Sequence, residues 1–400
     1  MTNLHNSPVI VSGARTPVGR FMGSLSNYTA ADLGSIAIRG ALQRAGLDGG
    51  LVQYVVMGQV LTAGAGQVPA RRAAIAAGIP MSVPAINVNM VCLSGLEAIA
   101  SAAQLVSAGA FDIVVAGGQE SMSRAPHLLL TSRTGTKYGN TTLVDHLAHD
   151  GLYDAYTGLP MGTLTDQHNA DEMSPVSRAD QDAYAAMSHE RAATATADGL
   201  FDEEIAPVQI DSARRHQAKS ITADEAVRPD VSMETLSRLP LAFSELGTIT
   251  AATASPLSDG AAAVVIMSKG KAIELGLQWL AEISAHAVVA GPDSSLQHQP
   301  SRAITAACAK AGVMPTSLDL AEINEAFAAV AITSTRDLGL DPQKVNVNGG
   351  AIAIGHPLGM SGARITLHLA LQMQRQQASI GAAALCGGGG QGSALILSVG

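Results

Sequence analysis

The stretch AINVNMVCLSGLEAIA, residues 85–100, carries the pattern that decides the fold, because its lead-in NVN recurs at residues 346–348. After the first NVN come SG at 94–95, a helical run, the apolar run FDIVVAGG and a glycine turn. After the second come SG at 361–362, the helical run ARITLHLALQMQ, the apolar run GAAALCGGGG and another glycine turn. Two strand–helix units that match in order and in lead-in residues predict a duplicated fold.

Strands alternate with helices elsewhere in the chain. Residues 8–16, PVIVSGART, predict a strand, and residues 30–46 predict an amphipathic helix that stops at a glycine. This alternation predicts an α/β fold with a largely parallel sheet and helices on both faces. The segment at about 119–249 is more polar and holds one clear helix, opened by Ser177 and Asp180. We interpret it as a long excursion inserted into the first half.

Composition and charge exclude several classes of protein. Of the 400 residues 47% are hydrophobic and 3% aromatic, and the net charge is −9 with no basic stripe, so we expect no nucleic-acid partner. No uninterrupted apolar run reaches the length of about 18 residues that a membrane span needs. Three scattered cysteines predict neither a disulfide framework nor a zinc site. The first residues lack the pattern of a signal peptide, so we expect a cytoplasmic protein.

Cys92 is the first candidate for chemistry. Ser94 and Glu97 have the spacing of a capping box, which predicts that a helix begins just after Cys92. Unpaired N–H groups at a helix N-terminus favour an anion, so we expect this position to lower the pKa of the thiol and to favour the nucleophilic thiolate. The alternative is a buried cysteine that packs as a small hydrophobic residue.

Two further segments carry polar residues in unusual surroundings. NEAFAAVAI, residues 324–332, follows a predicted strand, which places Asn324 at the carboxyl end where α/β sheets bind ligands, although a turn residue is an alternative. GGAIAIGHPLGMSG, residues 349–362, surrounds His356 with five glycines and a proline. Such a loop can approach a substrate closely and hold an imidazole that acts as a base or as a hydrogen-bond donor to an oxyanion.

Cys386 follows an apolar run and opens CGGGGQG, residues 386–392. The glycines match G-x-G-x-x-G, but only eight residues follow, so no helix completes a dinucleotide site. A cysteine that leads into glycine amides indicates instead an acid/base thiol beside an oxyanion hole. Together Cys92, His356 and Cys386 predict covalent catalysis through a thioester acyl-enzyme.

Other candidates are weaker. His146 and His149 lie in DHLAHD, within a polar region, and a solvated surface explains them better than a metal site, so we predict no bound metal. Cys308 lies on the helical run AITAACAKAG and is expected to pack in the core.

Four of these segments, NMVCLSG, NEAF, GGAIAIGHPLGMSG and CGGGGQG, resemble the motifs of the thiolase family, in the same order. VIVSGARTPVGRFMGSL, GGQESMS and SDGAAAVV are also similar, so the resemblance covers nearly the whole chain. It implies an α/β fold of two βαβαβαββ halves in a five-layer α-β-α-β-α arrangement with an inserted loop domain. The implied boundaries are 1–118 with 250–272 for the N-terminal half, 119–249 for the loop domain, which would bind coenzyme A, and 273–400 for the C-terminal half.

The resemblance also implies roles for the site residues. Cys92 would accept the acyl group from acyl-CoA, and His356 would activate that thiol and help bind the thioester oxygen. Cys386 would remove a proton from the α-carbon of acetyl-CoA or return it. Asn324 would hold a water that completes one oxyanion hole, and the backbone amides of Cys92 and Gly388 would form the other.

Coenzyme A would lie where this chain departs from the family pattern. The positions that correspond to family contacts with substrate or coenzyme A are Met161, Arg228, Ser255 and Phe327. The departures near them are Pro160 for a histidine, Thr253 for an asparagine and Pro256 for a glycine. These changes leave the expected chemistry intact and put the acyl chain length and the binding geometry of coenzyme A in question.

The activity implied by the resemblance is an acyltransferase that condenses two acetyl-CoA into acetoacetyl-CoA and CoA through an acetyl-cysteine. An alternative of the same class is a 3-ketoacyl-CoA thiolase of β-oxidation that acts on longer chains. Alternatives of other classes are a ketosynthase-like enzyme, which would not need Cys386, and a catalytically silent scaffold that binds CoA. No permanently bound cofactor is expected, CoA is substrate and product, and a homodimer or homotetramer is implied.

Overall fold

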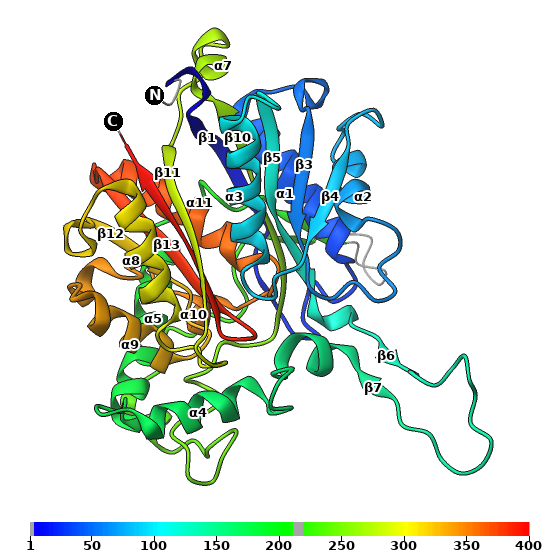
Figure 1. Cartoon of the computed structure of the whole chain (residues 1–400), viewed down its shortest axis with the longest axis vertical. Helices are drawn as coiled ribbons and strands as arrows, with labels where there is room; N and C mark the ends of the chain where they lie inside the picture. Colours follow the sequence, from blue (N-terminus) through cyan, green and yellow to red (C-terminus); the bar gives the residue numbers. More distant parts are fainter. Residues whose placement is uncertain (1–3, 211–218, 400) are drawn as a thin grey trace.

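The computed structural model of the chain describes residues 4–210 and 219–399, in which two similar halves lie side by side (Figure 1). The strands of the first half have the spatial order β4-β3-β5-β10-β1, and those of the second half have the order β12-β13-β14-β11. The first-half strands are β1 Pro8–Arg15, β3 Tyr54–Gly58, β4 Ala85–Val88, β5 Ile113–Ser121 and β10 Ser258–Ser268. The second-half strands are β11 Ala281–Ala290, β12 Leu320–Ile323, β13 Ile380–Gly387 and β14 Gln391–Ser398.

The two strand orders are the same order repeated. Strands β3, β5, β10 and β1 of the first half correspond to β12, β13, β14 and β11 of the second. Val345 pairs in parallel with Ala321 of β12, which corresponds to the place of β4 beside β3. The halves meet where β1 pairs with β11 through Val9 with Glu282 and Ile10 with Ala281. The duplication predicted from the repeated NVN lead-in is confirmed.

The expectation of a largely parallel sheet is wrong, because the strands pair in both directions. β3 is parallel to β4 and to β5, and β12 is parallel to β13. Every other pair among the main strands is antiparallel. In the second half the reason is a short glycine turn that joins the consecutive strands β13 and β14, because so short a turn can connect only antiparallel strands. The corresponding strands of the first half, β5 and β10, are also antiparallel although a long segment separates them.

Helices form three layers around the strands. α3 Ser94–Ser107 and α11 Ser361–Gln376 pack against each other between the two halves, as Figure 1 shows for α11. The outer helices are α1 Ala30–Ala45 and α2 Pro69–Ala76 on the first half, and α8 Gln299–Ala311 and α9 Ala328–Leu338 on the second. Apolar residues of α3 and α11 share one buried cluster with residues from both sets of strands. The layers therefore follow the order α-β-α-β-α.

Local sequence explains where several of these elements begin and end. Thr29 and Asp32 form a capping box at the start of α1, and Gly46 ends that helix with a φ of 64°. Ser177 Oγ accepts a hydrogen bond from the backbone N–H of Asp180 and caps the helix α5 Arg178–Ala197, as predicted.

The segment between β5 and β10 holds most of the irregular structure. Its elements are η3 Met122–Arg124, β6 His127–Leu128, β7 Val144–Asp145, η4 Leu147–Leu152, α4 Met161–Asp171, α5 Arg178–Ala197, β8 Val208–Ile210, β9 Lys219–Ile221 and α6 Met233–Ser237. The other short elements are η1 Leu4–Asn6, β2 Gly19–Arg20, η2 Gly49–Leu51, α7 Lys269–Glu274, η5 Pro315–Ser317, η6 Pro342–Lys344 and α10 Ala351–Ile354. Among the helices of the described residues, none has the length and apolar character needed to cross a membrane.

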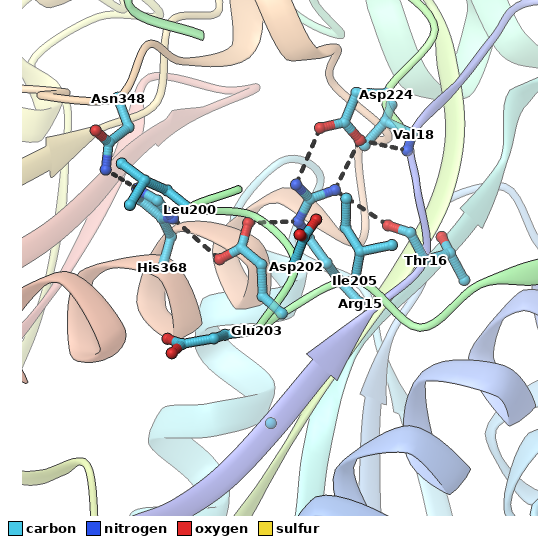
Figure 2. A network of polar contacts seen from close by, with 12 residues as sticks. Arg15, Thr16, Val18, Leu200, Asp202, Glu203, Ile205, Asp224, Asn348 and His368 are labelled. Atoms are coloured by element: carbon cyan, nitrogen blue, oxygen red, sulfur yellow. Dashed lines mark hydrogen bonds and ion pairs between the residues drawn. The ribbon is translucent and has the colours of Figure 1, made fainter. Parts of the chain in front are cut away.

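A buried ionic network fastens this segment to both halves (Figure 2). Arg15, at the end of β1, donates from Nε to Glu204 over 2.7 Å and from both terminal nitrogens to Asp224 over 2.7 and 2.9 Å. Glu204 is also 3.0 Å from Nδ1 of His368 on α11, and Asn348 continues the network at 3.1 Å from the other ring nitrogen. Burial alone would raise the pKa of Glu204, but Arg15 and His368 outweigh it and lower this pKa from 4.5 to about 2.

We predict that Glu204→Gln lowers the free energy of unfolding at neutral pH by about 3 kcal/mol, because the buried Arg15 guanidinium then keeps only Asp224 as a charged partner and His368 loses its carboxylate partner. The matched control is Glu203→Gln: that side chain is 65% exposed and pairs with Arg375, so its loss should stay below about 1 kcal/mol.

Urea unfolding followed by the fluorescence of the single tryptophan measures both losses. A carboxylate whose pKa is lowered on folding contributes stability above its unfolded pKa and loses that contribution as the pH falls. The difference in unfolding free energy between the native protein and Glu204→Gln should therefore become smaller as the pH falls from 4.5, the ordinary pKa of the carboxyl, to about 2, its pKa in the folded protein. Equal losses for the two variants at neutral pH would contradict the role assigned to the network.

Candidate active site

The three residues predicted to carry the chemistry line one cavity. Cys92 comes from the start of α3, His356 from the loop before α11, and Cys386 from the end of β13. The cavity has a volume of about 490 Å³, and most of its wall is apolar. The apolar lining includes Met161, Phe243, Leu296, Phe327 and Leu358.

Cys92 lies in a tight turn just ahead of α3. The preceding residue, Val91, has a φ of 51°, a left-handed conformation that is strained for a β-branched side chain. Ser94 Oγ accepts from the backbone N–H of Met90 over 2.8 Å and donates to the carbonyl of Val91 over 2.6 Å. The hydroxyl of Ser94 thus closes the turn that presents Cys92.

The predicted capping box of Ser94 and Glu97 is wrong. Leu93 is the N-cap residue, and no side chain caps α3. The carboxylate of Glu97 instead contacts His286 Nε2 over 2.9 Å and accepts from Ser393 Oγ, both in the second half of the molecule. Ser94 therefore bonds to the turn that precedes it, and Glu97 bonds to partners distant in the sequence, so the two side chains do not cap the helix together.

The thiol of Cys92 is also not activated in the way the sequence suggested. The residue is 5% exposed, and burial raises the pKa of its thiol from 9.0 to about 12, with a further rise from the nearby charge of Glu120. Its position ahead of α3 does not outweigh this burial. In the free protein Cys92 is therefore a neutral thiol, and it would need a base to act as a nucleophile.

His356 has the properties of that base. Burial, aided by the charge of Arg364, lowers the pKa of the imidazole from 6.5 to about 3, so the ring is neutral. Nδ1 is 2.6 Å from Ser361 Oγ, which in turn donates to the carbonyl of Pro357. This chain makes Nδ1 the protonated nitrogen and leaves Nε2 as the acceptor, 3.5 Å from the amide nitrogen of Asn324. The lone pair on Nε2, which has only this long contact with Asn324, can take a proton from a thiol.

The loop that carries His356 is seated on the first half of the molecule through its backbone. A Cβ atom on Gly95 of α3 would lie 2.6 Å from the carbonyl oxygen of Gly359, and one on Gly118 of β5 would clash with the same oxygen. Glu120, two residues further along β5, accepts a hydrogen bond from the backbone N–H of Gly359 over 2.9 Å. Small residues at these points let the loop approach α3 closely enough to bring His356 to the cavity of Cys92.

Cys386 is the third polar group of the cavity. It is 1% exposed, and burial together with the proximity of Cys92 raises the pKa of its thiol well above the ordinary value of 9.0. The glycine turn follows at once, and a Cβ atom on Gly388 would lie 3.2 Å from Cε of Met161 and 3.5 Å from the side chain of Val91. Gly388 is therefore a neighbour of the turn that presents Cys92.

The residues expected to contact coenzyme A divide between two environments. Met161, Ser255 and Phe327 line the cavity, as do two of the departures from the family pattern, Pro160 and Pro256. Arg228 is exposed and is not part of the cavity wall; its backbone N–H donates to His189 Nδ1 over 3.2 Å. Thr253 is fully buried and hydrogen bonds to Thr250.

The residues that the sequence offered as weaker candidates for a metal site or for chemistry lie outside the cavity. His146 and His149 both contact the carboxylate of Asp150. Cys308 is buried among apolar residues on α8, as expected. Within 4–210 and 219–399, no group of three or more histidine, cysteine or acidic side chains is arranged to hold a metal ion.

Two buried charges beside the catalytic groups were missed from the sequence as functional residues. Glu120 lies in the motif GGQESMS and Arg364 lies on α11, and both side chains are buried. Charged residues inside such apolar surroundings are rare enough in protein interiors to be the signal that finds them.

Family models and relatives show to which family the chain belongs. The model of the thiolase N-terminal domain matches residues 8–270, and that of the thiolase C-terminal domain matches residues 277–399. The chain is 59% identical to the probable acetyl-CoA acetyltransferase of Mycolicibacterium smegmatis, over 97% of this chain and 100% of the relative. It is 50% identical to the acetyl-CoA acetyltransferase of Cupriavidus necator and 46% identical to that of Schizosaccharomyces pombe, in each case over 97% of this chain and 98% of the relative. The chain belongs to the thiolase family.

Proposed function

We propose that this acyltransferase catalyses the reversible condensation of two acetyl-CoA to acetoacetyl-CoA and CoA, through an acetyl group held on Cys92. The observation that carries the proposal is the convergence of Cys92, His356 and Cys386 on one apolar cavity, with Asn324 against the imidazole. The printed names of the relatives, acetyl-CoA acetyltransferases at 46–59% identity, support the same activity.

In the first half-reaction the thiol sulfur of Cys92 attacks the thioester carbon of acetyl-CoA while Nε2 of His356 accepts the thiol proton. The backbone amides of Cys92 and Gly388 are suited to stabilise the oxyanion of the tetrahedral intermediate. Collapse of that intermediate breaks the bond to the sulfur of CoA. Cys386, whose raised pKa keeps it a neutral thiol, protonates the departing CoA thiolate and becomes a thiolate itself.

In the second half-reaction that buried thiolate of Cys386 is a strong base, because its surroundings disfavour its charge. It removes a proton from the α-carbon of the second acetyl-CoA, and the enolate attacks the acetyl carbon on Cys92. The protonated imidazole of His356 donates to the enolate oxygen, together with a water held by Asn324, and then returns its proton to the leaving thiolate of Cys92. The proton that His356 accepts and the proton that Cys386 donates in the first half-reaction are both returned in the second.

The side chains of the cavity wall bear on the acyl chain length. Phe243 and Phe327 stand edge to face with their ring centroids 5.9 Å apart, and both line the cavity, which favours a short acyl group. The apolar wall would also suit a longer chain, so the alternative is a 3-ketoacyl-CoA thiolase of β-oxidation. The division of the chain at 118 and 249, the assembly into a homodimer or homotetramer and a cytoplasmic location remain predictions.

We predict that Cys92→Ala abolishes the incorporation of label from radioactive acetyl-CoA into the protein, because the thiol that accepts the acetyl group is removed. Cys386→Ala should still take up label but lose at least about 100-fold in condensation rate, since the carbon step then lacks its base. Cys308→Ala, a buried cysteine outside the cavity, is the matched control and should behave as the native protein does. Equal labelling of the Cys92 and Cys386 variants would contradict the separate roles of the two cysteines as acyl acceptor and as base.

Chain length is tested by CoA-dependent thiolysis of acetoacetyl-CoA, 3-ketodecanoyl-CoA and 3-ketohexadecanoyl-CoA. We expect activity with acetoacetyl-CoA and a steep decline with the longer substrates, because the two phenylalanines narrow the cavity. Phe243→Ala should extend the accepted chain length, while Cys92→Ala provides the inactive reference. Comparable rates at all three lengths would favour the β-oxidation alternative.

A further inference from the structure

A buried carboxylate, that of Glu325, directly follows Asn324 and takes no part in the proton transfers of the reaction. Its side chain is fully buried, and Glu325 does not line the catalytic cavity, so it is not placed to touch a substrate. Burial of a carboxylate is costly unless hydrogen bonds compensate it. The donors of those hydrogen bonds show which parts of the molecule the carboxylate holds.

Four donors converge on the two oxygens of this carboxylate. Oε1 accepts from the hydroxyl of Tyr184 and from Nδ2 of Asn346, each over 3.0 Å. Oε2 accepts from Ser188 Oγ over 2.8 Å and from the backbone N–H of Ile352 over 3.0 Å. The two hydroxyls come from α5, the amide comes from the second NVN, and the backbone N–H comes from α10. Glu325 therefore joins three separate segments of the chain to the end of β12.

The loop that carries His356 begins against this carboxylate. A Cβ atom on Gly350 would lie 2.5 Å from Oε1 and 2.6 Å from Oε2 of Glu325, so a larger residue there would displace the carboxylate. The backbone N–H of Gly350 donates to Ser188 Oγ over 3.1 Å, and that hydroxyl donates to Glu325. Glu325 and Ser188 thus fix the point from which the loop runs to His356.

The same carboxylate braces the strand end that leads to Asn324. Asn346, which donates to Glu325, also donates from Nδ2 to the carbonyl of Ile323 and accepts the N–H of Ile323 at Oδ1, both over 2.8 Å. Asn324 is the next residue, and its amide nitrogen lies 3.5 Å from Nε2 of His356. The contacts of Glu325 therefore reach both members of this pair, one through the strand end and the other through the start of the loop.

The first half of the molecule has no carboxylate at the corresponding position. The residue just before each NVN pairs in parallel with a strand of its own half, with Val56 in the first half and with Ala321 in the second. Counted forward from these partners, Glu325 corresponds to Val60. The duplicated fold itself therefore does not require a buried carboxylate here. The copy that has one is the copy whose strand end and loop supply the amide and the imidazole of the site.

We propose that Glu325 is a positioning residue that sets the placement of Asn324 relative to His356, because it holds the strand end of the one and the loop of the other. The proposal rests on the proposed function only for the task of that pair, which is to stabilise the enolate oxygen with a held water and a donated proton. A displacement of about 1 Å between such groups can lower a rate by about 100-fold.

Glu325→Gln tests the tether with a side chain of the same size. Nδ2 of Asn346 donates to one carboxylate oxygen and the N–H of Ile352 donates to the other, and neither group can accept a hydrogen bond. The amide nitrogen of the variant therefore faces a donor in either orientation, and one attachment is released. The matched control is Glu204→Gln, which also removes a fully buried carboxylate but one that bonds to Arg15 and His368.

Hydrogen exchange of the substrate-free protein, followed by mass spectrometry of its peptides, measures the tether without CoA or turnover. We expect the backbone N–H groups of residues 349–360 to exchange about tenfold faster in Glu325→Gln than in the native protein, because a hydrogen bond that anchors the loop is lost. Glu204→Gln should exchange at the native rate in this peptide. An unchanged rate in Glu325→Gln, or the same acceleration in both variants, would overturn the proposal.

Condensation kinetics show whether the placement matters for the reaction. Because Glu325 lies outside the cavity, we expect the KM for acetyl-CoA to stay within about twofold and the kcat per site that accepts label to fall at least about tenfold. Glu204→Gln should keep the native kcat per labelled site. A native kcat in Glu325→Gln, or an equal fall in both variants, would overturn the positioning role. Absence of condensation in the native protein would refute the proposed function, whereas the exchange result would still decide whether Glu325 tethers the loop.

Discussion

The close backbone contact between α3 and the loop that precedes α11 is the constraint on which the site depends. The carbonyl of Gly359 sits where any side chain on Gly95 or Gly118 would be, and a Cβ atom on Gly362 would clash with the backbone of Leu96. Glycine at these positions allows two helix starts, one from each half, to meet without side chains between them. Cys92 and His356 occupy those two starts, so the contact that joins the halves also assembles the catalytic pair.

Burial then determines the resting chemistry of the pair. Both thiols of the cavity have raised pKa values and the imidazole has a lowered one, so the free site carries no charge on its reacting groups. Two neutral partners suit a reaction in which a proton must shuttle back and forth, because each proton transfer is driven by bond formation at carbon rather than by a standing ion pair. The low polarity of the cavity wall strengthens each interaction with an oxyanion that forms there.

Local signals in the sequence carried much of the fold and of the site. The repeated NVN lead-in indicated the duplication, and the glycine-rich surroundings of His356 and Cys386 indicated a cavity that both residues do line. The errors arose where distant parts of the chain decide the outcome. Glu97 takes partners in β11 and β14 rather than the helix cap, the sheet mixes strand directions, and burial reverses the expected pKa shift of Cys92. None of these follows from spacing along the chain, because each depends on what packs against the residue in three dimensions.

The buried ionic network has a consequence for how substrate reaches the cavity. Glu204 and Asp224 come from the segment between β5 and β10, and both hold Arg15 at the end of β1. To swing this segment away as a hinged lid would strip the guanidinium of its partners, a cost of about 3–5 kcal/mol. A state with the segment swung away would therefore make up less than about one hundredth of the molecules. The segment is therefore held to the rest of the molecule at Glu204 and Asp224, which disfavours a motion that lifts it away as one rigid lid when substrates enter.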